Sequence, residues 1–151
     1  MNKNTAVFVS ALTAIALLGA GCNNLPGKRS TEPMPPAISV ADQALSETNE
    51  VLIKEAAIDQ NGWIVVHAVE NGQAGEAIGY TSLAAGEETK IKISVDKNKV
   101  TPTLIAMLHY DRDPMGSYDF PNGDGPVIKD MQVITDEFSI SNYSDIKKDA
   151  S

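Results

Sequence analysis

Four aspartates crowd into the segment that runs from residue 107 to residue 126, MLHYDRDPMGSYDFPNGDGP. Closely spaced carboxylates are typical of calcium sites, because Ca2+ takes about six to eight oxygen ligands in loose geometry. Counted from the first aspartate, an EF-hand loop fails, since Met115 stands at position five and Asn122 at position twelve. Two hypotheses stay open: a calcium site of another kind, or an inter-strand loop whose carboxylates bond nearby backbone amides. The candidate calcium ligands are Asp111, Asp113, Asp119 and Asp124.

A second group of possible metal ligands lies in two apolar stretches, GWIVVHAV (62–69) and TLIAMLHY (103–110). If these stretches are neighbouring strands whose faces coincide, His67, His109 and Met107 form a nitrogen and sulfur set suited to copper. Without a cysteine ligand, such a set is not a blue-copper centre of the usual kind. The alternative is a pair of buried histidines, each satisfied by a backbone carbonyl or by the carboxylate two residues after His109.

Aromatic side chains lie close to both groups. Trp63, Tyr118 and Phe120 either pack inside the fold or rim a surface groove, where they would form an interaction surface. No serine stands in a nucleophile-elbow motif, and only two histidines are present as bases. We therefore expect a protein that is not an enzyme.

Short β-branched runs separated by glycine, asparagine and aspartate must position these side chains. KIKISV (90–95) alternates strictly and predicts a half-buried strand, whereas 62–69 and 103–110 are apolar on both faces, as in covered central strands. The stretch 47–57 also has a helix-like spacing, but a strand is favoured there. The expected strands cover residues 38–41, 51–58, 62–69, 76–83, 90–95, 103–110 and 131–140.

About seven strands in a domain of residues 37–141 predict an all-β fold, an immunoglobulin-like two-sheet β-sandwich. A small β-barrel is the second choice. Residues 142–151 are polar without periodic apolar positions, and we expect them to form an irregular tail.

The first 21 residues have the pattern of a secretory signal peptide. A single cation, Lys3, precedes an apolar run from Ala6 to Leu18, which is shorter than the about 20 residues that a membrane-spanning helix needs. The segment ends LLGAGC, which resembles the lipobox of bacterial lipoproteins, although Gly19 departs from the usual leucine. The resemblance implies cleavage before Cys22 and acylation of its thiol, for instance with palmitate, which anchors the chain in a membrane.

Two features next to the signal peptide agree with export and lipid attachment. Cys22 is the only cysteine of the chain, so no disulfide can form within it. Residues 22–36 are polar and proline-rich, and they predict a disordered tether between the lipid and the domain. The residue after the cysteine is Asn23. In Gram-negative lipoproteins an aspartate at this position retains the protein in the inner membrane, so Asn23 is compatible with sorting to the outer membrane of a Gram-negative cell.

The charge of the chain limits its partners. Removal of residues 1–21 takes away Lys3 alone and lowers the formal charge from −8 to −9. A chain so acidic is a poor ligand for nucleic acid and for anionic lipid surfaces. The expected partners are therefore the membrane, through the lipid, and another envelope protein.

Four blocks, GWIVVHA, AIGYTSLAAGE, TPTLIAMLHYD and YDFPNGDGPV, resemble an uncharacterised domain family of exported prokaryotic proteins, lipoproteins among them. This resemblance spans about residues 38–140 and implies a β-rich domain outside the cytoplasm. It implies no activity. The sequence as a whole predicts a lipid-anchored lipoprotein of the cell envelope with a non-catalytic binding domain, and the alternative is an envelope protein that binds calcium or copper.

Overall fold

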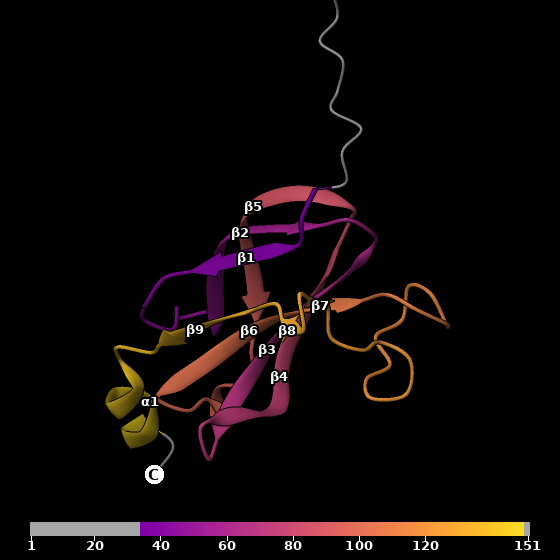
Figure 1. Ribbon diagram of the computed structural model, residues 1–151. Coiled ribbons are helices and arrows are strands. Elements are labelled where there is room, and N and C mark those ends of the chain that lie inside the picture. The colour runs from indigo at the N-terminus through magenta and orange to yellow at the C-terminus, as the bar shows by residue number, and fades with distance from the viewer. Residues whose placement is uncertain (1–33, 150–151) are drawn as a thin grey trace, which may run out of the picture. The chain divides into compact units, whose positions relative to one another are not determined.

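The computed structural model describes residues 34–149, which fold into two antiparallel sheets and a small hairpin (Figure 1). The first sheet has the strand order β1-β2-β5 and the second the order β4-β3-β6-β9. The strands of the first sheet are β1 (Ala37–Val40), β2 (Glu50–Ile58) and β5 (Gly86–Ser94). Those of the second are β3 (Gly62–Glu70), β4 (Gln73–Leu83), β6 (Thr103–Tyr110) and β9 (Thr135–Ser139).

The hydrophobic core lies between the two sheets, as the alternation of apolar residues dictates. In β5, Ile91 and Ile93 are buried while the intervening Lys92 is exposed, so this strand presents one apolar face to the core. Phe138 of β9 and Ile53 of β2 belong to the same core cluster, and neither is more than 1% exposed. Burying each such side chain stabilises the fold by about 1.5–3 kcal/mol.

The predicted all-β, two-sheet sandwich is confirmed, because the strands form separate antiparallel sheets and no closed barrel within residues 34–149. Residues 50–58 are strand β2, so the helix-like spacing in that stretch does not produce a helix. Strands β3 and β6 pair with each other in the interior of the second sheet, which explains why both are apolar on two faces.

The expected single strand at residues 131–140 is divided. Asp130 and Met131 have φ of 50° and 64°, and this left-handed turn closes a hairpin of β7 (Ile128–Lys129) and β8 (Gln132–Val133) before β9 begins. A loop of residues 111–127, here called the β6–β7 loop, connects β6 to this hairpin.

The C-terminal residues differ from the irregular tail that the sequence predicts. Helix α1 (Tyr143–Asp149) follows β9, and Tyr143 and Ile146 pack against the core cluster. Their spacing of three residues places both on one face of a helix, a signal too short to be recognised in a polar segment. A one-turn 3-10 helix, η1 (Lys97–Lys99), links β5 to β6.

Three predicted features lie outside the residues that the structure describes: the signal peptide (1–21), the acylation site Cys22 and the tether up to residue 33. Within residues 34–149, no helix combines the length and the apolar character needed to cross a membrane.

Candidate functional site

The pairing of β3 with β6 places both histidines on one face of the second sheet. Trp63 of β3 pairs with His109 of β6. His67 follows Trp63 by four residues in β3, so it lies on the same face, and it pairs with Ile105. The side chains that alternate with them, such as Ile64, point into the core. The condition on which the sequence made the copper hypothesis depend is therefore met: the strands are neighbours and the two faces coincide, on the side of the sheet that faces away from the core.

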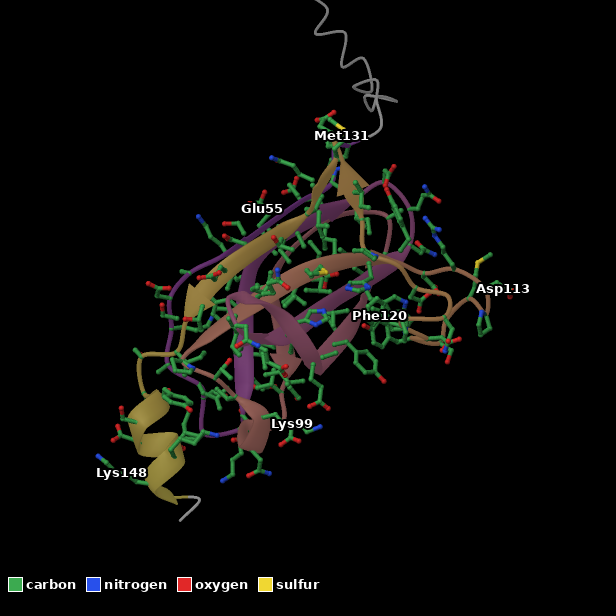
Figure 2. The ribbon with its side chains drawn as sticks, turned by 60° about the horizontal axis from the view of Figure 1, so that its bottom comes forward. Glu55, Lys99, Asp113, Phe120, Met131 and Lys148 are labelled. Carbon is green, nitrogen blue, oxygen red and sulfur yellow. The ribbon has the colours of Figure 1, made fainter. Side chains whose placement is uncertain are left out.

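Six rings gather on this outer face and form what we call the ring cluster: Trp63, His67, Tyr80, His109, Tyr118 and Phe120. The imidazoles of His67 and His109 are nearly parallel, with an interplanar angle of 20° and ring centroids 5.7 Å apart. Phe120 meets both rings edge-on, with its centroid 5.1 Å from that of His109 and 6.5 Å from that of His67. In Figure 2, Phe120 lies where the β6–β7 loop folds back over the sheet, while Asp113 lies at the outer end of that loop.

The β6–β7 loop is held over the ring cluster by Asp124. This carboxylate is only 1% exposed, and its two oxygens accept hydrogen bonds of 2.8 Å from the backbone N–H groups of Arg112 and Asp119. The Asp111 carboxylate accepts a further bond from Gly116 N–H, at 2.9 Å to either oxygen. Hydrogen bonds of this kind to ionised acceptors are among the strong ones, so these carboxylates fix the shape of the loop.

The four aspartates proposed as calcium ligands do not converge. Asp119 accepts a bond of 2.9 Å from the Asn122 amide, and Asp113 is exposed at the outer part of the loop. Among residues 34–149, no group of three or more histidine, cysteine, aspartate or glutamate side chains is arranged to hold a metal ion. The carboxylates of Asp111 and Asp124 bond backbone amides instead, which is the alternative that the sequence offered.

Each histidine is oriented by a backbone carbonyl. His67 Nδ1 lies 2.9 Å from Gly75 O, and His109 Nδ1 lies 2.9 Å from Asp124 O. Because a carbonyl only accepts, Nδ1 carries the proton in both rings and Nε2 of the neutral ring carries a lone pair. Asp111 takes no part in this, although the sequence named its carboxylate as one possible partner of His109.

Burial favours the neutral form of both imidazoles. It lowers the pKa of His67 and of His109, while the bond from each Nδ1–H to its carbonyl raises the pKa and offsets part of that effect. The proximity of His67 lowers the pKa of His109 further. Burial also raises the pKa of Tyr118 to about 12, with smaller contributions from Asp124 and Tyr80, so this hydroxyl stays protonated.

Four polar atoms of the ring cluster are buried without a hydrogen-bond partner: Trp63 Nε1, His67 Nε2, His109 Nε2 and Tyr118 Oη. No other buried side-chain nitrogen or oxygen of the described residues lacks one. Buried polar groups are nearly always paired, and each exception calls for an explanation. All four lie on the outer face of the sheet, which marks this face as the candidate site.

The proposed interaction residues fall into two classes. Trp63 is only 7% exposed and packs edge-on against Tyr118, so it does not form part of an open surface. Tyr118 is half-buried, and Phe120 is 43% exposed. Tyr80 is 53% exposed and lies 4.6 Å from Tyr118 between ring centroids, and sequence reasoning did not include it.

A break in the strand alternation explains why Tyr80 was missed. Simple alternation puts Ile78 and Tyr80 on one face, but the register of β3 with β4 shifts between Val66 and His67. This irregularity lets Ile78 enter the core while Tyr80 pairs with Val65 on the outer face. No signal in the stretch AIGYTSL marks the shift beyond its glycine.

Met107 occupies the outer face as well. It lies in β6 between Ile105 and His109, pairs with Val65 and is half-buried. Because side chains alternate along a strand, the Met107 side chain lies on the same side of the sheet as the two imidazoles. Cys22, the remaining predicted site residue, is outside the described residues.

Comparisons with known proteins agree with the boundaries of the sandwich. The model of a family described as domain of unknown function, DUF7282, matches residues 36–141. The chain is similar to two proteins of Haloarcula hispanica, cell surface glycoprotein 2, with 30% identity over 106 residues, and cell surface glycoprotein 1, with 28% identity over 106 residues. These residues are 69% of the chain but 11% of each relative, so the chain spans about a ninth of their length. No solved structure matches.

Proposed function

The chain belongs to the DUF7282 family, and we propose that it is a lipid-anchored module of the cell surface that binds another envelope protein. The observation that carries this proposal is the similarity of the sandwich to a segment of two cell surface glycoproteins. In those relatives the segment is a small part of a long chain. Here, the sequence offers an acylated cysteine as the means of attachment to the surface.

The N-terminal sequence supports the lipid anchor. Cys22 follows a signal-like segment, and only the tether separates it from the first described residue, Met34. Two or three acyl chains on one cysteine are enough for stable anchoring, at about 0.8 kcal/mol per buried methylene.

Detergent phase partition in a bacterial host that acylates lipoproteins tests the anchor. The wild-type chain should enter the detergent phase and incorporate a palmitate analogue, and Cys22→Ser should do neither. Asn24→Ser is the matched control, because it makes a similar change two residues away and keeps the thiol. Equal partition of the wild type and Cys22→Ser would refute the anchor.

The exposed rings of the cluster are the surface that we assign to the partner. Tyr80 and Phe120 are about half exposed, and each packs on a ring beneath it, so they form a rigid apolar edge beside the β6–β7 loop. Rigid aromatic side chains are typical anchors of protein interfaces.

Site-specific photo-crosslinking tests the interaction surface. A photoreactive residue at position 120 should give one discrete crosslinked product on intact cells, and Tyr80→Ala should weaken it. Leu52 supplies the matched control, because it is 45% exposed on β2, in the other sheet. Crosslinks of equal strength from positions 52 and 120 would argue against a specific surface.

A further inference from the structure

We propose that His67 and His109 form a binding site for the cuprous ion, Cu(I), with the thioether of Met107 as a third ligand. The site shares no residue with the proposed lipid anchor, and it lies beneath the exposed aromatic edge instead of on it. Neither the description of the family nor the names of its relatives mention a copper ligand.

The separation of the two rings fits a shared ion. Their centroids are 5.7 Å apart, within the about 4.5–7 Å found for paired aromatic rings, so the two imidazoles are close enough to share one ion. Two nitrogen–ion bonds of about 2.0 Å, added to the half-widths of two imidazoles, place the centroids about 6 Å apart when one ion lies between the Nε2 atoms. The two rings are nearly parallel, with an interplanar angle of 20°, and both Nε2 atoms lie within the same buried cluster.

The two ligand atoms are prepared for a metal in the way that metal-binding histidines usually are. In each ring the opposite nitrogen, Nδ1, donates to a backbone carbonyl, which fixes the tautomer and leaves a lone pair on Nε2. The side chains are 3% and 0% exposed, and both Nε2 atoms are buried without a partner. A structural histidine gains nothing from an unpaired Nε2, whereas a metal ligand requires one.

The surroundings select the kind of ion. The described residues offer no cluster of anionic ligands, and Cys22 is the only cysteine of the chain, so the four-ligand sets that zinc prefers cannot be assembled within the sandwich. Imidazole nitrogen and thioether sulfur suit copper, and thioether favours the cuprous state. A monovalent ion also costs less to transfer into a dry aromatic pocket than a divalent one, because the solvation penalty grows steeply with charge.

The contribution of Met107 follows from its place in the register. It precedes His109 by two residues on the same face, and its cross-strand neighbour Val65 lies between Trp63 and His67. Methionine is long and flexible, with rotatable bonds that let its sulfur reach a site defined by stiffer groups. The two histidines are therefore the fixed ligands, and the thioether completes the set.

Competition with the Cu(I) chelator bicinchoninate, under ascorbate, tests the proposal. The full chain with Cys22→Ser should be used, so that the thiol does not bind copper and anchoring does not enter the result. We expect one Cu(I) per chain, and a loss of affinity of about 100-fold or more in His67→Gln and in His109→Gln. Met107→Leu should bind about 10-fold more weakly, and Met131→Leu, at a side chain that is 97% exposed, should bind as the parent does.

X-ray absorption of the 1:1 complex identifies the ligand atoms directly, and its imidazole readout comes from the parent chain alone. The parent spectrum should show imidazole scattering together with one sulfur neighbour, and Met107→Leu should lose the sulfur. No stoichiometric binding, a spectrum without imidazole scattering, or unchanged affinity in both folded histidine variants would overturn the site. Sulfur scattering that persists in Met107→Leu would remove the third ligand, and equally tight Zn(II) binding at the same histidines would overturn the assignment to Cu(I).

Discussion

Replacement of Asp124 by asparagine tests whether this carboxylate holds the β6–β7 loop over the ring cluster. Its two oxygens accept hydrogen bonds of 2.8 Å from the backbone N–H groups of Arg112 and Asp119. Asparagine can accept only one of these bonds, because its NH2 group then faces the other N–H. One charge-assisted bond is lost, about 1.5–3 kcal/mol, and the remaining bond is weakened to a neutral one, so we expect a total loss of about 3 kcal/mol.

Urea unfolding, followed by circular dichroism and by the emission of Trp63, measures this loss. Trp63 is the only tryptophan of the chain and is 7% exposed beside Tyr118, so its emission reports whether the loop covers the sheet. With an m-value of about 2 kcal/mol per M, the midpoint of Asp124→Asn should fall by about 1.5 M. Its Trp63 emission should also shift to the red before the dichroism changes, because the loop opens first.

Asp113→Asn makes the same chemical change at an exposed position of the same loop and should alter the free energy of unfolding by less than about 0.5 kcal/mol. If Asp124→Asn unfolds within about 0.5 kcal/mol of this control and its Trp63 emission stays unshifted, the loop is held by other contacts. The reasoning about the buried carboxylate would then be refuted.

Three further predictions concern pH, the core and a close backbone approach. The free energy of unfolding should be steady above about pH 6.5 and fall as the pH decreases below it, with a slope of at most about 1.4 kcal/mol per pH unit for each of His67 and His109. The reason is that burial lowers the pKa of both rings, so the unfolded chain takes up protons that the folded chain does not, until the pH reaches the lowered pKa values. A pH series of urea titrations measures this slope. Phe138→Ala should cost about 3–5 kcal/mol in the same titration, because this ring is 1% exposed in the core. Gly79→Ala should lower the free energy of unfolding by more than about 1 kcal/mol, because a Cβ there would clash with the backbone oxygen of Ser94.

Each of these three predictions has a control variant that tests the physical cause given for it. A double replacement of His67 and His109 by leucine should remove up to about 2.7 kcal/mol per pH unit of the acid slope, and an unchanged slope would contradict the assignment to these rings. Met131→Ala, at an almost fully exposed side chain, should change stability by less than about 0.5 kcal/mol. Gly125→Ala should be similarly mild, because no atom lies within 4 Å of the added Cβ.

The sequence by itself determined the fold class and the faces of the main strands. The alternation in residues 90–95 and the two doubly apolar stretches were enough to predict a sandwich with β3 and β6 as central strands, since local side-chain periodicity reflects burial directly. It also placed His67 on one strand face with Trp63 and Val65, and His109 on one strand face with Ile105 and Met107, because side chains alternate with a period of two. Whether these two faces coincide was decided by the pairing of the strands.

Only the tertiary structure decided what lies together on that face. The return of the β6–β7 loop over the sheet depends on Asp124 bonding amides of Arg112 and Asp119, and no local pattern specifies such contacts. The shift in register of β4, which turns Tyr80 outward, is likewise a matter of how two strands align. The four unpaired polar atoms of the ring cluster follow from these non-local contacts, because burial and lack of a partner depend on every neighbouring segment at once.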